Sequence, residues 1–241
     1  MLHNLNPESI LFLDIETVPM TRCYEDLPER MKPLWKRKAD TITRFDKNVP
    51  ETPPSPEELY AKAGIYAEFG KIVCISTGIL RQDSLRIKSF FGHDEKQLLM
   101  EFKDLLDKST GRSIHLLCAH NGKEFDFPYL IRRMLINYVQ LPKLLNLVGK
   151  KPWEVNHLDT MELWKFGDYK NYTSLELLAA VFDIPTPKDD IQGSDVARVF
   201  WEENDLDRIV TYCQKDVLTI ANLLLCFMGL PIMQETQIKY V

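Results

Sequence analysis

The sequence predicts an α/β fold in which helices flank a central mixed sheet of five strands. Short apolar runs of strand length alternate along the chain with longer segments whose apolar residues recur at helical spacing. The order of these segments favours three antiparallel strands, followed by two strands that are added through helical crossovers. The chain has 241 residues, of which 45% are hydrophobic, so it can bury the core of a single domain of this kind.

The first strand is predicted at 10–13, where an unbroken apolar run fits a central strand that is covered on both faces. Asp14 and Glu16 follow this run. In an extended chain they point to the same side, because side chains alternate with a period of two. Carboxylate oxygens are the ligands that Mg²⁺ and Mn²⁺ prefer, so the pair indicates a metal site. A solvated strand end is the alternative, since Asp-x-Glu is common in a chain with 35 acidic residues.

Two further strands are predicted at 71–78 and 85–91, and the turn-like residues 81–84 join them into a meander with the first strand. A helix is predicted at 95–106, where leucine and phenylalanine recur at helical spacing. The segment 20–64 that separates the first two strands is predicted to be an insertion or cap. Its proline-rich part, 48–58, is predicted to be an extended loop.

A second acidic position follows the predicted strand at 114–119. His120, Asn121 and Gly122 read as a strand-to-helix turn, and a helix is predicted at 125–136, with Asp126 in its first turn. Helix capping and the helix dipole would also explain an Asp at this position, without any function. His120 is predicted to be a turn residue rather than a metal ligand.

The third acidic position lies in a predicted helix near the end of the chain, within 208–227. Its apolar stripe consists of Val210, Cys213, Val217, Ile220 and Leu224. Tyr212 and Asp216 are four residues apart and therefore lie on one helix face. A half-buried Tyr beside a solvated Asp is the alternative. Before this helix, 173–176 matches a capping box and 183–193 is predicted to be a loop.

Three segments together resemble a known family. LFLDIETVP, HNGKEFDFPYL and YCQKD are similar to the three motifs of the DEDD 3′-5′ exonucleases, in the same order, and Tyr-x-x-x-Asp places the third in the tyrosine subclass. The residues of the first two motifs are most similar to those of the proofreading domains of family B DNA polymerases. The resemblance runs from about residue 9 to about residue 228 and implies a ribonuclease H-like fold. The long segment 20–64 departs from the family pattern.

The resemblance implies a site for two divalent ions, Mg²⁺ or Mn²⁺. Asp14, Glu16 and Asp216 would bind the first ion. Asp14 would bridge to the second, on which Asp126 would act directly or through water, and Tyr212 would orient the attacking water. Two such ions about 3.5–4 Å apart can stabilise both the attacking and the leaving oxygen of a phosphodiester.

Candidate substrate contacts are less well defined. The resemblance implies that Thr17, Asn121 and Phe125 contact the terminal nucleotide. In the 20–64 segment, Lys36, Arg37 and Lys38 form a cationic cluster beside Trp35, which suggests phosphate contacts and base stacking. A peripheral flap with a solvated charged helix and a buried Trp is the alternative.

The expected function is therefore that of a metal-dependent 3′-5′ exonuclease that acts on single-stranded DNA 3′ ends. A 3′-5′ exoribonuclease would use the same acids, and a catalytically silent nucleic-acid-binding module would keep the fold. The chain has no room for a polymerase domain in addition. A net charge of −5 does not by itself indicate nucleic-acid binding, although positive charge is also found at Arg132, Arg133, Lys143, Lys150 and Lys151.

The remaining composition points to a cytoplasmic protein that does not contact a membrane, and it leaves protein partners open. The five cysteines include no Cys-x-x-Cys pair, and three lie in apolar runs, as buried thiols in a reducing compartment would. The five histidines show no zinc-like spacing. No secretory signal or run of about 20 apolar residues is found.

Overall fold

The computed structural model describes residues 2, 5–45, 52–109, 114–168, 170, 172–185 and 191–241. In this part of the chain one mixed sheet has the strand order β5-β4-β1-β2-β3-β6. β1, β2 and β3 are antiparallel neighbours, and β4 and β5 continue the sheet in parallel with β1. The predicted α/β fold is confirmed, with one additional short strand at the C-terminal end. The strands are β1 (Ile10–Pro19), β2 (Gly70–Arg81), β3 (Ser84–Phe91), β4 (Leu116–Ala119), β5 (Leu158–Asp159) and β6 (Ile238–Tyr240).

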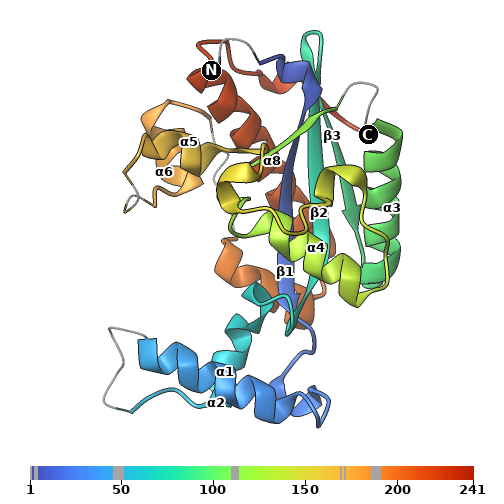
Figure 1. Ribbon diagram of the computed structural model, residues 1–241, viewed down its shortest axis with the longest axis vertical. Helices are drawn as coiled ribbons and strands as arrows, with labels where there is room; N and C mark the ends of the chain where they lie inside the picture. The colour runs from blue at the N-terminus through green and yellow to red at the C-terminus, as the bar shows by residue number, and fades with distance from the viewer. Residues whose placement is uncertain are drawn as a thin grey trace.

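Helices cover both faces of the sheet (Figure 1). α3 and α4 pack on one face, and α8 packs on the other. α6 lies against the C-terminal part of α8. The helices are α1 (Lys32–Phe45), α2 (Pro56–Leu59), α3 (Glu95–Ser109), α4 (Asp126–Ile136), α5 (Thr160–Lys165), α6 (Leu175–Val181), α7 (Val196–Arg198) and α8 (Leu206–Phe227).

β1 is the central strand, and it is longer than predicted. Leu11, Leu13 and Ile15 face α3 and α4, whereas Ile10 and Phe12 face α8. The strand does not end where the chain becomes acidic, because β2 pairs with it through Pro19. The register shifts between Glu16 and Thr17, so that a bulge lies beside the acidic pair.

The described parts of the segment 20–64, residues 20–45 and 52–64, form a small lobe beyond the C-terminal end of β1 (Figure 1). The lobe has its own apolar cluster, in which Trp35 is fully buried and donates its indole N–H to the carbonyl of Pro56 at 2.7 Å. Trp35 therefore cannot stack on a base, and the suggestion of stacking is wrong. The Trp35 side chain instead anchors α1 to the rest of the lobe. The predicted loop at 48–58 lies partly outside the described residues, and its end forms a capped turn from Ser55 to Glu58.

Two local predictions also need correction. The N-cap of α6 is Ser174, whose side chain accepts from the N–H of Leu177, so the predicted capping box at 173–176 is not formed. Arg133 is not a surface cation, because it is buried in an ion pair with Glu95. The predicted loop at 183–193 lies partly outside the described residues.

α8 is the longest described helix, and it is confirmed where the apolar stripe predicts it. By length and composition alone it could cross a membrane, but 61% of the relevant window is buried inside the protein. Such burial is what a core helix shows. Gly78 of β2 allows the close contact, since a Cβ atom there would lie 2.8 Å from Val217.

Candidate active site

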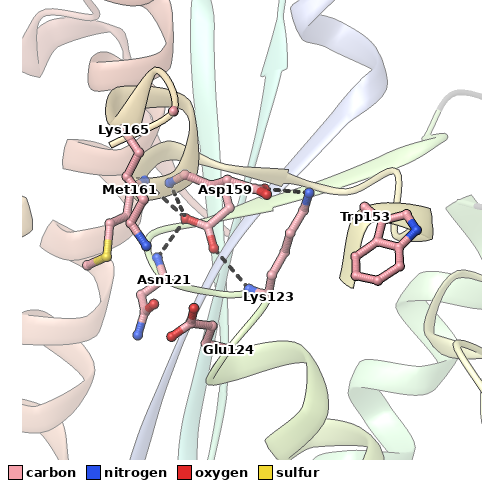
Figure 2. Close-up of a pocket in the computed structure, with 9 residues that line it drawn as sticks. Asn121, Lys123, Glu124, Trp153, Asp159, Met161 and Lys165 are labelled. Carbon is pink, nitrogen blue, oxygen red and sulfur yellow. Dashed lines mark hydrogen bonds and ion pairs between the residues drawn. The ribbon is translucent and has the colours of Figure 1, made fainter. Parts of the chain in front are cut away.

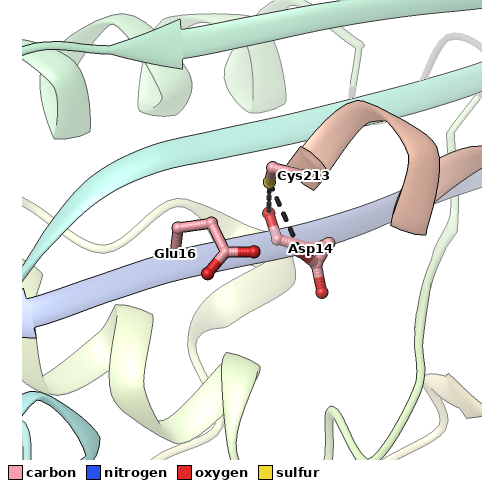
Figure 3. Close-up of side chains that lie close together, drawn as sticks. All are labelled: Asp14, Glu16 and Cys213. Carbon is pink, nitrogen blue, oxygen red and sulfur yellow. Dashed lines mark hydrogen bonds between the residues drawn. The ribbon is translucent and has the colours of Figure 1, made fainter. Parts of the chain in front are cut away.

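Asp14 and Glu16 continue the α8-facing side of β1, as predicted. One carboxylate oxygen of each, together with the thiol sulfur of Cys213, lies within a single group of atoms at most 4.8 Å apart (Figure 3). Burial raises the pKa of both carboxyl groups well above the usual range, and the nearby charge of Asp216 raises both further. Ionising both carboxyl groups without a bound cation is therefore unfavourable.

Asp126 joins this pair from α4 and is only 4% exposed. β4 pairs with β1 only as far as Phe12, so the next part of this edge of β1 is free to meet the start of α4. There the backbone N–H of Ile15 donates to the Asp126 carboxylate. Burial is the main reason why the pKa of Asp126 rises from 3.8 to about 8, and Asp159 and Asp216 add to the effect.

Asp216 completes the acidic cluster from α8. Its charge raises the pKa of Asp14, Glu16 and Asp126, so all four acids of the three sequence motifs meet at one place. Tyr212 lies one turn earlier on the same helix face. Burial raises the pKa of its phenol, and the hydroxyl group donates to Asp216. Tyr212 is thus held as a neutral hydrogen-bond donor beside the acids.

Cys213 is a member of the site that the sequence placed only in the apolar stripe. Its thiol donates to Asp14, with sulfur 3.3 Å from carboxylate Oδ2 and 3.4 Å from the backbone carbonyl oxygen. The contact fixes α8 against β1 at the acidic pair. Because Tyr212 directly precedes Cys213 on α8, the same contact also positions the Tyr212 phenol relative to Asp14. The position of Cys213 next to Tyr212 was the one sign in the sequence that it belongs to the site. It was not used, because a buried thiol in an apolar stripe is usually only a core residue.

Asp159, at the end of β5, organises the turn before α4. Its buried carboxylate accepts backbone N–H bonds from Asn121 and Lys123 at 2.9 and 3.0 Å, and from Met161 at 3.0 Å (Figure 2). A single side chain therefore joins the start of α5 to the turn that leads to Asp126. No prediction singled out Asp159, because nothing in its local sequence distinguishes a capping Asp from a solvated one.

The turn is held from a second side by His120. One ring nitrogen lies 2.9 Å from the hydroxyl of Thr160, and the other lies 3.0 Å from the carbonyl of Thr173. Burial lowers the pKa of this imidazole. His120 is thus a structural turn residue, as predicted. Gly122 is required here because a Cβ atom would lie 2.4 Å from that of Ala119.

The candidate substrate contacts fall into two groups. Thr17, Asn121 and Phe125 each lie on a segment that carries one of the acids: Thr17 follows Glu16, and Phe125 precedes Asp126. The Phe125 ring packs on Tyr129 at 5.3 Å between centroids. The second group lies on α1 in the lobe, beyond the end of β1 (Figure 1). It consists of the largely exposed Lys36 and Arg37 and of Lys38, whose ammonium group lies 4.0 Å from the Tyr66 ring centroid.

The donor set suits hard divalent cations. Asp14, Glu16 and Asp126 have a raised pKa and lie close to Asp216, and a dication would remove the repulsion between these four carboxyl groups. Oxygen donors favour Mg²⁺ or Mn²⁺, whereas the thiol of Cys213 stays protonated because burial raises its pKa well above the usual range. The residues therefore fit the cofactor that the sequence motifs imply.

The fold and the acidic cluster together define an exonuclease-like α/β domain. A family model described as "predicted 3′-5′ exonuclease related to the exonuclease domain of PolB" matches residues 65–236. The chain belongs to this family. The match includes the second and third motifs, while Asp14 and Glu16 precede it.

Among solved structures, the family B DNA polymerase from the hyperthermophilic archaeon Pyrobaculum calidifontis is similar over 92% of this chain, with a TM-score of 0.49 and 16% identity. The chain spans 25% of that polymerase. No match to a curated protein was found.

Proposed function

We propose that the protein is a metal-dependent 3′-5′ exonuclease that removes nucleotides from single-stranded DNA 3′ ends. The observation that carries this proposal is the convergence of Asp14, Glu16, Asp126 and Asp216 at one place, from three segments far apart in the chain. Capping or a solvated strand end would explain each acid alone. Neither explains why all four lie together, where the charge of Asp216 raises the pKa of each of the other three.

In this proposal Asp14, Glu16 and Asp216 would hold one divalent ion, and Asp14 would also hold a second, on which Asp126 would act directly or through water. When bound, such ions make a water molecule more acidic and stabilise charge on phosphate oxygens. The neutral hydroxyl group of Tyr212 orients that water by a hydrogen bond. The thiol of Cys213 keeps the carboxylate of Asp14 in place.

Substrate contacts are assigned to both groups of candidate residues. Thr17, Asn121 and Phe125 contact the terminal nucleotide, because they lie on the segments that carry the acids. The exposed cations of α1, Lys36 and Arg37, together with Lys38, contact phosphates further along the strand. DNA is proposed because the first two motifs are most similar to DNA proofreading domains. An exoribonuclease is the second candidate, since the same acids serve either sugar.

The test is digestion of matched single-stranded DNA and RNA that carry either a 5′ or a 3′ label. With Mg²⁺ or Mn²⁺, 5′-labelled DNA should shorten in steps of one nucleotide, and 3′-labelled DNA should release labelled mononucleotide at once. Chelation should abolish both. Equal or faster digestion of RNA would support the second candidate, and no digestion of either would leave a binding module as the remaining function.

A further inference from the structure

A cavity of about 450 Å³ opens beside the acidic cluster, between the turn before α4 and the segment 153–167 (Figure 2). Asp159 belongs to its wall and is also the neighbour that raises the pKa of Asp126, so the cavity begins next to the acids. It has both polar and apolar walls. The lining side chains that matter here are Asn121, Lys123, Glu124, Trp153, Met161 and Lys165.

Trp153 is the unusual member of this wall. It is 75% exposed, although the other three tryptophans of the chain are buried or half-buried. Figure 2 places its ring across the cavity from Met161 and Lys165. The ammonium group of Lys151 lies 5.3 Å from the Trp153 ring centroid, and that of Lys165 lies 4.2 Å from the Tyr172 centroid. Trp153 and Lys165, which both line the cavity, each take part in a contact between a cation and an exposed aromatic ring.

We infer that this cavity is a subsite for an unpaired nucleotide of the substrate strand, one or a few positions before the terminal nucleotide. This inference rests on the proposed function and specifies its substrate as a strand that is single-stranded near its 3′ end. The base stacks on Trp153, and Lys165 and Lys151 lie near the adjoining phosphates. A base that is paired in a duplex could not stack in this way, because both of its faces are already covered by its neighbours.

The chemistry of the wall favours this occupant. An indole face binds any base without reading its sequence, and nearby cations suit a phosphodiester backbone. Two of the three acids of the wall are engaged within the protein: Asp159 accepts backbone N–H bonds, and Glu162 pairs with Lys123 at 2.6 Å. The volume lies within the range of about 300–1,000 Å³ that is usual for small-ligand sites.

The experiment measures KM and kcat for 5′-labelled single-stranded DNA in the full-length protein, for Trp153→Ala, Trp153→Phe and the control Tyr138→Ala. Tyr138 is another exposed aromatic residue, 93% exposed, beyond the end of α4 and outside this cavity. We expect Trp153→Ala to raise KM about tenfold, equivalent to ~1.4 kcal/mol, and to leave kcat within about twofold. Trp153→Phe should recover most of the loss, and Tyr138→Ala should equal the parent.

A second arm places one abasic nucleotide at successive positions from the 3′ end. At the position that occupies the subsite there is no base to stack, so the parent and Trp153→Ala should give the same KM there and differ at the other positions. The subsite is disproved if Trp153→Ala equals the parent on intact DNA, if no abasic position removes the difference, or if Tyr138→Ala has the same effect. Failure of the parent to release 3′ nucleotides would instead disprove the proposed function.

Discussion

The hydroxyl group of Tyr129 donates a hydrogen bond of 2.7 Å to the backbone carbonyl of Gly64. Tyr129 lies on α4, one turn after Asp126, and Gly64 lies where the lobe returns to the sheet. The same helix makes a second contact just after Gly64, where Arg133 donates a hydrogen bond of 2.7 Å to the backbone carbonyl of Ala67. The helix that presents Asp126 is therefore tied at two points to the exit of the lobe, and the lobe and the acidic cluster are mechanically connected.

Replacing Tyr129 by Phe should destabilise the protein. The ring would still fill its buried place, but the Gly64 carbonyl would lose its donor, at a cost of about 1–3 kcal/mol. Urea unfolding followed by circular dichroism measures the loss, with Tyr138→Phe as the exposed control. An unchanged free energy of unfolding in Tyr129→Phe would show that the hydrogen bond contributes nothing to the stability of the fold.

Replacing Asp14 by Ala should lower kcat at least about a hundredfold, because the proposed metal site loses a ligand shared by both ions. Asp216→Ala should behave in the same way. Folding should survive, since each change removes one of several mutually repelling carboxyl groups. Asp104→Ala, on the exposed side of α3, is the control. Digestion at the parent rate by Asp14→Ala would refute the site.

Replacing Tyr212 by Phe separates water orientation from metal binding. The variant loses only the hydroxyl group, so turnover should slow while the affinity for Mn²⁺ stays near that of the parent. Single-turnover kinetics and Mn²⁺ titration by electron paramagnetic resonance measure the two properties separately. A large loss of Mn²⁺ binding would contradict the assigned role of Tyr212.

The metal-free protein should lose stability as the pH rises. The pKa of Asp126 is raised from 3.8 to about 8, so between these values the folded state keeps a proton that the unfolded chain releases. Stability falls with increasing pH whenever the folded state binds more protons. In chelator, Tm should be lower at pH 8 than at pH 5.5 by on the order of 5 °C. Asp126→Asn should flatten this difference, and saturating Mg²⁺ should reduce it; a Tm that rises with pH would contradict the prediction.

Replacing Lys36, Arg37 and Lys38 together by Ala should raise KM for single-stranded DNA and reduce the dependence of KM on salt concentration. Each lost phosphate contact lowers the slope of log K against log[salt] by ~0.7 for a single strand. The matched control replaces Lys96, Lys103 and Lys108 on α3, which removes the same charge from another surface. If both triple variants change KM equally, the effect belongs to net charge and not to α1.

Patterning and burial explain which parts of this fold could be predicted. The apolar run at 10–13 and the apolar stripe of α8 both face the core, so their periodicity alone located them. The end of β1 could not be located in this way, because its continuation through Glu16 and Thr17 depends on pairing with β2. The short strand β6 likewise forms only through its pairing with β3, and it has too few residues for an alternating pattern to be recognised in the sequence.

The same distinction applies to the site. Asp14, Glu16, Asp126 and Asp216 were found because they stand in a recognisable order, and the structure brings them together. Asp159 was missed because two of its partners are backbone N–H groups 36–38 residues away, which leave no trace in the local sequence. Its contact with Met161 is local, but it is that of an ordinary helix cap. The position of Trp35 stayed open for a related reason: its neighbouring cations suggested a surface, while its burial depends on Tyr60 and Phe69.

The contact between Cys213 and Asp14 joins residues 199 positions apart. During synthesis at about 5–20 residues per second, the strand that carries Asp14 therefore waits ~10–40 s before α8 exists. Throughout that time the cluster lacks Asp216 and Tyr212, and a nascent chain could not cut nucleic acid near the ribosome. The proposed hydrolytic activity would thus be acquired late, when the part of α8 that carries Asp216 docks on β1.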